Sequence, residues 1–294
     1  MSDFVQQQHT ICNFSNEESW VILSPIEQNI KQKIESVGTP LKDWDIKIYR
    51  GVLTGYNDAF IISTEKRNEI LFNCQTEEER LRTVELIRPI LRGRDIKRYG
   101  YVDNGLYLIN THNGIRGRIP RIKIEDYPAV KAHLDQYWEN ISTRADKGDT
   151  PYNLRNCAYL EDFLKPKIMY PNMTKYIPFY FDKNGFYQND KSFMITGDTV
   201  AFLTAFLNSS IFKFCFLDNF PELQGGTREL RKIFFDKIPV LQVSKEINDA
   251  FIPKINDIQK DYTIEKAMEI DSMLFDLYNL TEEERETIGF IEIT

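Results

Sequence analysis

Two segments decide how this sequence is interpreted: residues 50–60, RGVLTGYNDAF, and residues 91–99, LRGRDIKRY. The first leaves a strand-like segment at residues 46–49 and enters another at residues 59–62. Between them lie two glycines, a threonine and an Asn-Asp pair, which are typical of turns with exposed polar tips. The second places four cations within seven residues, beside a glycine and a tyrosine. Together they predict a surface that contacts phosphates and base edges.

The charge around these segments is unevenly distributed. The chain of 294 residues has a net charge of −7, which argues against a generic polyanion binder. Residues 80–123 nevertheless carry eleven cations and three anions, a local charge of 11 − 3 = +8. The acidic residues are concentrated elsewhere, notably in residues 77–79 and 265–292. A basic segment in an acidic chain indicates an anion-binding surface, with the solvated face of a helix as the alternative for part of it.

Composition indicates a folded, soluble protein. Hydrophobic residues make up 42% and charged residues 28%, and the longest apolar run, residues 200–207, is far shorter than the roughly 20 residues of a membrane helix. The N-terminus lacks the basic and apolar segments of a secretion signal. The cysteines are widely spaced, which predicts neither disulfides nor zinc and favours a reducing, cytoplasmic location. They are Cys12, Cys74, Cys157 and Cys215.

Periodicity and turn residues predict both helices and strands. Apolar positions 26, 30 and 34 predict an amphipathic helix that Gly38 ends as a C′ residue. Residues 76–79 read as a capping box, opening a helix whose Leu81, Val84 and Ile87 are expected to face inward. Residues 105–109 read as a strand, and residues 182–185 as a hairpin turn.

After Pro239 the apolar spacing is only helical. We therefore expect a mixed α+β fold, a β-sheet-containing recognition domain followed by a C-terminal helical segment. The expected boundaries are 1–240 for that domain, with sub-parts of about 1–150 and 151–240, and 241–294 for the helical tail.

No catalytic motif is present in the sequence. The glycine-rich nucleotide loops and the G-x-S-x-G nucleophile motif do not occur, and the three histidines are not spaced as metal ligands. Asp-x-Lys occurs at residues 45–47 and 95–97, which leaves a magnesium-dependent nuclease as an alternative. We predict no catalytic residue and no metal site in this chain.

Several motifs, in one order, resemble the TaqI-like target-recognition (specificity) domain, the C-terminal part of adenine-specific DNA methyltransferases and of type IIG restriction–modification enzymes. They are GxxTGxNxAFI (51–61), ILxGRDIxRY (90–99), KPKI (165–168), LNS (207–209) and IP (238–239) after a Gly-Gly loop. Residues 269–284, EIDSxxFxLYNLTxxE, are similar to the helical tail of the same proteins. The resemblance spans about residues 41–292.

The resemblance implies sequence-specific recognition of double-stranded DNA, with no membrane partner. The glycine loop for S-adenosylmethionine and the Asn-Pro-Pro-Tyr motif of such enzymes do not occur here. We therefore expect no cofactor in this chain; S-adenosylmethionine and Mg²⁺ would belong to missing domains of a parent enzyme. The chain is expected to be a fragment of that enzyme, or a free-standing specificity subunit that docks a methyltransferase, with or without a nuclease.

Candidate DNA contacts follow from charge and from loop position. Arginine can pair bidentately with guanine, and both Arg and Lys contact phosphates. The candidates are Arg92, Arg94, Lys97 and Arg98 in the bend; Arg116, Arg118 and Arg121 in the next loop; Gln224, Thr227 and Arg228; and Tyr56 and Asn57. A protein-interaction scaffold that docks a partner through its C-terminal helices is a further alternative.

Overall fold

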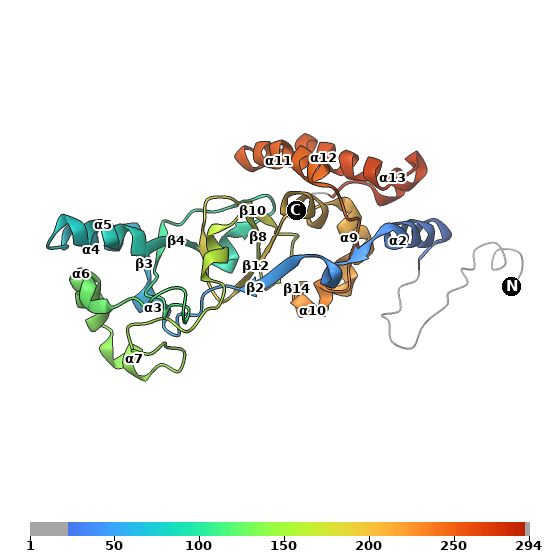
Figure 1. Ribbon diagram of the computed structural model, residues 1–294. Coiled ribbons are helices and arrows are strands. Elements are labelled where there is room, and N and C mark those ends of the chain that lie inside the picture. Colours follow the sequence, from blue (N-terminus) through green and yellow to red (C-terminus); the bar gives the residue numbers. More distant parts are fainter. Residues whose placement is uncertain (1–22, 292–294) are drawn as a thin grey trace, which may run out of the picture. The chain divides into compact units, whose positions relative to one another are not determined.

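The computed structural model describes residues 23–291, and its contacts divide the chain into two compact units (Figure 1). The central unit is Lys47–Val200. Among the described residues, the terminal unit joins 23–46 to 201–291. Helices and strands occur in both units, which confirms the mixed α+β class.

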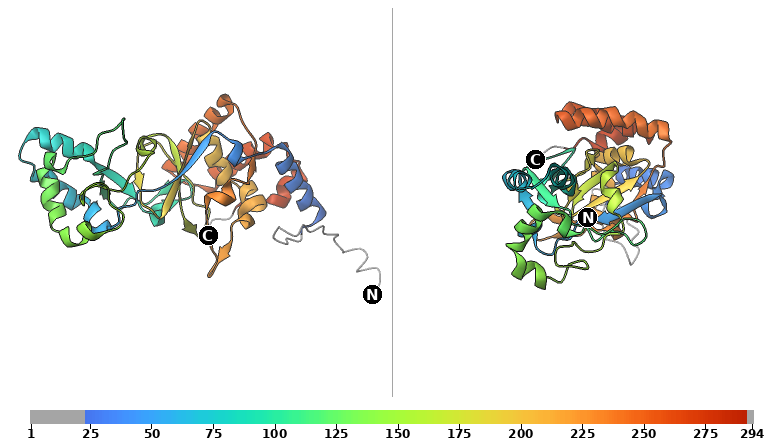
Figure 2. Two further views of the ribbon diagram at one scale, coloured as in Figure 1. Left: turned by 60° about the horizontal axis from the view of Figure 1, so that its bottom comes forward. Right: turned by 60° about the vertical axis from the view of Figure 1, so that its left-hand side comes forward.

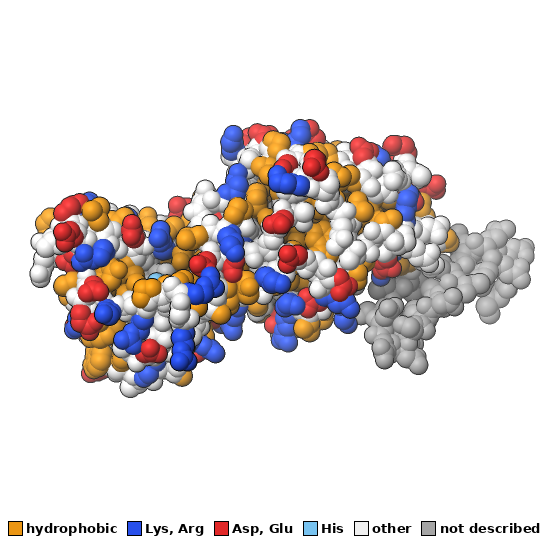
Figure 3. Space-filling view, viewed as in Figure 1, with side chains coloured by type: hydrophobic (Ala, Val, Ile, Leu, Met, Phe, Trp, Pro, Cys, Tyr) orange, Lys and Arg blue, Asp and Glu red, His pale blue; other side chains and the backbone are white. Residues whose placement is uncertain are grey.

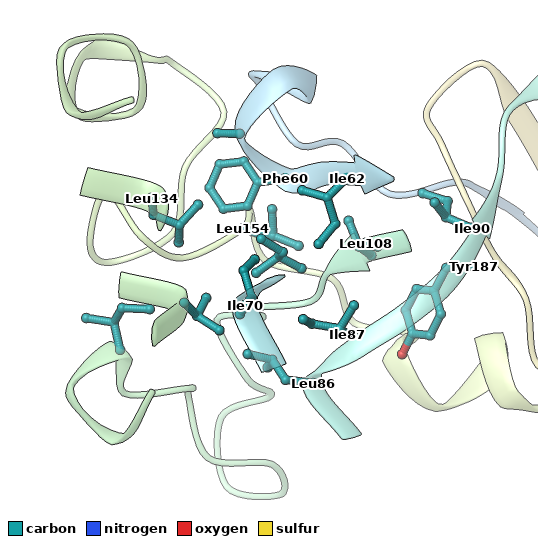
Figure 4. Packing of buried hydrophobic residues seen from close by; sticks show 14 of the residues in the cluster. Phe60, Ile62, Ile70, Leu86, Ile87, Ile90, Leu108, Leu134, Leu154 and Tyr187 are labelled. Carbon is teal, nitrogen blue, oxygen red and sulfur yellow. The ribbon is translucent and has the colours of Figure 1, made fainter. Parts of the chain in front are cut away.

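The first sheet of the central unit has the order β11-β4-β7-β3. Strand β7 (Leu106–Ile109) lies antiparallel to both β4 (Ile87–Leu91) and β3 (Ile61–Ser63), whereas β11 (Tyr187–Gln188) runs parallel to β4. Helices α4 (Thr64–Phe72), α5 (Glu77–Leu86), α6 (Pro128–Asp135) and α7 (Trp138–Thr143) belong to the same unit. Figure 4 shows apolar side chains of this core pointing toward one another, and the labelled ones include Phe60, Ile62, Ile87, Leu108 and Leu134.

The second sheet has the order β10-β8-β12-β2. Strand β8 (Lys167–Pro171) is antiparallel to β10 (Tyr180–Asp182) and to β12 (Ser192–Gly197), and every residue of β8 is buried. The fourth strand is β2 (Ile46–Arg50). The hairpin predicted at residues 182–185 is wrong, because β10 pairs with β8 and β11 pairs with β4 of the other sheet. The Asp182 carboxylate instead accepts the N–H groups of Asn184 and Phe186, both at 3.0 Å, and redirects the chain.

The terminal unit brings both ends of the described chain together. Helix α2 (Pro25–Val37) is capped by Ser24, and strand β1 (Thr39–Pro40) pairs with β15 (Pro239–Val240). The other helices include α8 (Val200–Leu207), α9 (Ser210–Phe216), α11 (Lys245–Lys260), α12 (Ile264–Leu277) and α13 (Glu282–Ile288). An ion pair between Lys254 and Glu269 joins α11 to α12, and Figure 2 shows these two helices close together.

The unit boundaries differ from the predicted ones for a physical reason. Lys33 of α2 donates to Glu284 of α13 at 2.7 Å and to the main-chain oxygen of Asn279 at 2.6 Å. The residues after position 240 thus share a unit with residues near the N-terminus. Nothing within one stretch of sequence indicates this long-range pairing.

The stretch at residues 50–60 is a bend stabilised by close backbone contacts. Gly51 donates its N–H to the Ser192 oxygen at 2.9 Å, and a Cβ at position 51 would lie 2.0 Å from the Asn189 oxygen. Gly55 has φ +69°, in the left-handed region that favours glycine. Residues Asn57–Phe60 form a short helix, α3, so the strand expected at residues 59–62 begins only at Ile61.

Gly51→Ala is expected to lower the free energy of unfolding by about 1–3 kcal/mol, because the new methyl group overlaps main-chain atoms that cannot move aside cheaply. Gly100→Ala is the matched control, since the nearest atom to its Cβ would be the Arg98 oxygen at 3.9 Å. That change should stay within about 0.5 kcal/mol. Urea unfolding of both variants measures the difference, and equal stabilities would contradict the prediction.

His133 of α6 makes the central unit sensitive to acid. The side chain is buried, and its Nε2 donates to the Ala59 oxygen at 3.0 Å. Burial lowers the pKa of His133 below its usual 6.5, so protons bind the unfolded chain first as the pH falls. Burial lowers the pKa of His112 in the same direction.

Stability should therefore be full above about pH 6.5 and fall below it, by at most about 1.4 kcal/mol per pH unit for one group. Urea unfolding at pH 7.5, 6.5 and 5.5 measures this slope. His133→Gln keeps a donor for the Ala59 oxygen and removes the titration, so its slope should be smaller. An unchanged slope would exclude His133 as the cause.

Candidate nucleic-acid interface

The loop after β7 forms an open hollow of about 770 Å³, here called the arginine basin. Its polar lining side chains are Asn113, Arg116, Arg118, Arg121, Asp149 and Asn156. Residues Ile115 and Ile119 bridge as an antiparallel pair, with the Ile115 N–H donating to the Ile119 oxygen at 2.8 Å. The turn between them carries Arg116 and Arg118, both exposed, on either side of Gly117, whose φ is +78°. This loop therefore presents two guanidinium groups to solvent from a defined turn.

The three arginines differ in their ionic partners. Arg118 pairs with Glu161, and Arg121 pairs with Asp149 at 3.0 Å. Within residues 23–291, Arg116 makes no ion pair or side-chain hydrogen bond. Exposed ion pairs contribute only about 0–1 kcal/mol, so a phosphate can replace the carboxylates at small cost. In the space-filling view, Lys and Arg side chains gather on the part of the central unit near α7, with a few acidic ones between them (Figure 3).

Buried Arg144 stabilises the loop at residues 146–153, whose Asp149 lines the basin. Its guanidinium lies 4.4 Å from the Phe60 ring centre and donates to four main-chain oxygens. These belong to Thr54, Asp146, Pro151 and Asn153. Burial lowers the pKa of Arg144 to about 10, which still leaves it charged at neutral pH. The side chain thus ties residues 51–57 to residues 146–153.

Asn113 of the basin stabilises the same loop. Its Oδ1 accepts the Asp149 N–H at 2.9 Å, and its Nδ2 donates to the Asp149 carboxylate at 3.0 Å. Asn153 donates to the oxygens of Thr111 and Ile122 at 3.3 and 3.0 Å. The sequence prediction missed Arg144, Asn113 and Asn156. Residues 147–151, KGDTP, predict only a hinge or an exposed loop.

The bend at residues 91–99 is stabilised by an internal ion pair. Arg92 donates through Nε and Nη2 to the Asp95 carboxylate at 2.9 and 3.0 Å, and Asn104 donates to the same carboxylate at 3.0 Å. Asp95 is only 3% exposed, so the acid of the second Asp-x-Lys segment stabilises the bend. Arg94 and Lys97 are exposed, and the Lys97 Nζ donates to the Arg94 oxygen at 2.9 Å. Half-buried Arg98 lies 5.6 Å from the ring centre of Tyr99.

A family model described as the TaqI-like C-terminal specificity domain matches residues 88–240, which is more than half of the chain and includes both the bend and the basin. The chain belongs to this family. The match confirms the resemblance drawn from the motifs. No curated protein matches the sequence.

Two solved structures show the same fold as this specificity domain. The type IIG restriction endonuclease BpuSI is 14% identical with a TM-score of 0.51, over 87% of this chain and 33% of that one. The type IIL restriction–modification enzyme MmeI, solved in complex with DNA, is 12% identical with a TM-score of 0.57, over 84% of this chain and 35% of that one. The chain spans about a third of the length of these two enzymes.

The other predicted contacts of the specificity domain lie apart from the basin loop in the sequence. Tyr56 is half-buried and packs against Tyr137, with 6.1 Å between ring centres, so most of its ring belongs to the core. Asn57 is exposed, and its Oδ1 accepts the Thr54 hydroxyl at 2.6 Å. Both side chains therefore make contacts that stabilise the local structure.

The third predicted set lies in the terminal unit, on the antiparallel strands β13 (Glu222–Leu223) and β14 (Thr227–Glu229) and the turn between them. Gln224 is exposed and Thr227 is half-buried. Arg228 donates to the Phe220 oxygen at 2.7 Å and pairs with Asp218 and Glu222 at 2.9 and 3.2 Å. The intervening Gly225 and Gly226 have φ of +77° and +76°, as the tight turn requires.

Among residues 23–291, no group of three or more His, Cys, Asp and Glu side chains is placed to hold a metal ion. In the same residues, no single helix is long and apolar enough to cross a membrane. Helix α8 and residues 210–219 together have the length and the apolar composition of a membrane span, but they are bent by 66° relative to each other.

Proposed function

We propose that this chain is the DNA sequence-recognition module of a type II restriction–modification enzyme of the adenine-methylating kind. One observation carries the proposal: a specificity domain presents the exposed Arg116, Arg118 and Arg121, with the exposed Asn156, around a single hollow. Arginine reads guanine O6 and N7, and asparagine reads adenine N6 and N7. Such a surface supplies both phosphate contacts and base readout.

Arg94 and Lys97 of the bend add exposed cations that suit phosphate contacts. Arg92 acts differently in this proposal, since its bonds to Asp95 fix the shape of the bend. Methyl transfer, with S-adenosylmethionine, and any magnesium-dependent cleavage are assigned to a methyltransferase or nuclease domain or subunit outside this chain. The proposed location is the cytoplasm, where the DNA substrate is present.

Binding to a pool of random duplexes at 50–200 mM salt tests this proposal. The logarithm of the affinity should fall with the logarithm of the salt concentration, with a slope of about −0.9 for each phosphate contacted. The three basin arginines therefore contribute about −2.7 to the slope, and Arg94 and Lys97 add to it. Repeated selection from the pool should enrich one short sequence. Absence of salt-dependent binding at 50 mM would refute the proposal for this chain.

A further inference from the structure

A second, smaller hollow of about 270 Å³ lies beside the arginine basin in the central unit. Residues of β4, of the segment after β7 and of the 3₁₀ segment η4 (Leu160–Leu164) line it. Ile119 lines both hollows, and the ion pair between Arg118 of the basin and Glu161 of this hollow joins their edges. Ligand pockets generally have about 300–1,000 Å³, so this one suits a small ring system.

One polar group of this hollow has an unsatisfied hydrogen-bonding atom. Asn110 is 7% exposed, its N–H donates to the Leu86 oxygen at 3.2 Å, and its Nδ2 donates to the Tyr187 hydroxyl at 3.2 Å. Its buried Oδ1 has no hydrogen-bond partner within residues 23–291. A buried acceptor without a donor is destabilising, and a ligand N–H would remove that penalty. Figure 4 shows the Tyr187 ring beside β4, with its hydroxyl directed away from Ile90.

His112 adds a donor to the same lining. Its Nδ1 accepts the Gly114 N–H at 3.2 Å, and burial lowers its pKa, so the neutral ring carries its proton on Nε2. The remaining lining is mainly apolar and aromatic, and includes Leu86, Tyr127 and Leu164. Its charged members are Arg82, Arg88, Glu85 and Glu161. An acceptor, a donor and apolar walls together suit a planar heterocycle, and Arg88 at the edge can pair with a phosphate beside it.

We propose that this hollow holds one unpaired nucleobase of a DNA molecule bound at the arginine basin. The inference rests on the proposed function, because continuity with the basin places the base on a bound strand. Asn110 Oδ1 accepts an amino or imino hydrogen of the base edge, and the His112 ring donates to a base acceptor. Arg88 contacts the adjoining phosphate. The hollow therefore reads a base that has left the duplex stack, and leaving the stack costs less for an unpaired base than for a paired one.

Three duplexes of one flanking sequence test this inference: fully paired, with a single 2-aminopurine bulge, and with an abasic bulge at the same place. The abasic duplex has the same backbone distortion without the base. The wild-type chain should bind the 2-aminopurine bulge about tenfold more tightly than the abasic bulge. Bound 2-aminopurine should also be protected from acrylamide quenching.

Leu164→Trp fills the hollow, and Leu81→Trp is its matched control. Leu164 is 55% exposed and Leu81 57% exposed, so neither change disturbs the core, and only Leu164 lines the hollow. Leu164→Trp should abolish the tenfold preference and the protection, and leave binding to the paired duplex within twofold. Leu81→Trp should retain both.

The outcomes separate this inference from the proposed function. Equal affinity for the 2-aminopurine and abasic bulges, with salt-dependent binding to all three duplexes, would overturn the nucleobase site alone. Retention of the preference in Leu164→Trp would also overturn it. Failure to bind any duplex at 50 mM salt would overturn the proposed function, and the nucleobase site with it.

Discussion

Asp182→Asn is expected to lower the free energy of unfolding by about 3–5 kcal/mol, the cost of leaving a buried charge without its partner. Lys167 and Asp182 face each other across β8 and β10, and both side chains are 0% exposed. The Lys167 ammonium donates to the Asp182 carboxylate and to the Phe163 oxygen, the latter at 2.6 Å. Burial lowers the pKa of Lys167, and the Asp182 carboxylate opposes that shift. Asparagine keeps the size of the side chain and removes the countercharge.

Urea unfolding followed by circular dichroism measures this change. Asp149→Asn is the matched control, because it makes the same substitution in the exposed pair with Arg121 and should cost no more than about 1 kcal/mol. Lys167→Met added to Asp182→Asn removes the uncompensated charge and should recover part of the loss. A cost below about 1 kcal/mol for Asp182→Asn would show that the pair does not need its charge.

Local features of this fold could be predicted from the sequence because their causes are local. The apolar spacing at residues 26–34 predicted α2, where Ile30 and Ile34 are 0% exposed. The Thr76 hydroxyl accepts the Glu79 N–H at 3.1 Å, as the predicted N-cap requires. Strand β7 occupies residues Leu106–Ile109, within the predicted 105–109. In each case the deciding contacts lie within a few residues of one another.

Predictions failed where a distant partner decides the structure. Helix α5 was expected to bury Leu81 and Val84, but these are 57% and 37% exposed, and Glu79 is buried instead. The Glu79 carboxylate accepts the N–H groups of Gln75 and Ala129 at 2.8 and 2.9 Å, and the second bond joins α5 to α6. An apolar stripe read from the sequence carries no information about such a bond.

Gly38 shows the same limit at a helix end. The sequence predicted a C′ glycine, typically left-handed, yet its φ is −84°. A Cβ there would lie 2.6 Å from the Pro239 carbonyl carbon, so strand pairing of β1 with β15 requires glycine. The sequence correctly identified Gly38 as a special position, but the residue that requires glycine there, Pro239, lies 201 residues away (239 − 38).

The candidate site shows which functional residues can be predicted from residue type alone and which cannot. Charge clustering selected both the bend and the basin loop, but it could not distinguish Arg92, which is bonded to Asp95, from the exposed Arg116. Nor could it indicate Arg144, whose four carbonyl partners lie at residues 54–153. Partner identity is a property of the fold, and it decides which arginines remain available for a ligand.

Replacing Arg116, Arg118 and Arg121 together with glutamine is expected to weaken duplex binding about a thousandfold. Hydrogen bonds to charged groups contribute about 1.5–3 kcal/mol each, and 1.4 kcal/mol is a factor of ten. The slope of log affinity against log salt should decrease in magnitude by about 3. Because all three side chains are exposed, the variant should fold as the wild type does. Fluorescence anisotropy at several salt concentrations measures both quantities.

A matched triple variant determines whether the basin, rather than net charge, causes the loss. Glutamine at Lys66, Arg80 and Lys131 removes the same charge from local ion pairs on α4, α5 and α6, and should weaken binding less than about tenfold. Asp149→Asn with Glu161→Gln releases Arg121 and Arg118 from their carboxylates, and should strengthen binding. Net-charge attraction alone would make the two triple variants equal, because each loses three positive charges. Only a phosphate-binding site in the basin makes the variant of Arg116, Arg118 and Arg121 bind more weakly than the variant of Lys66, Arg80 and Lys131.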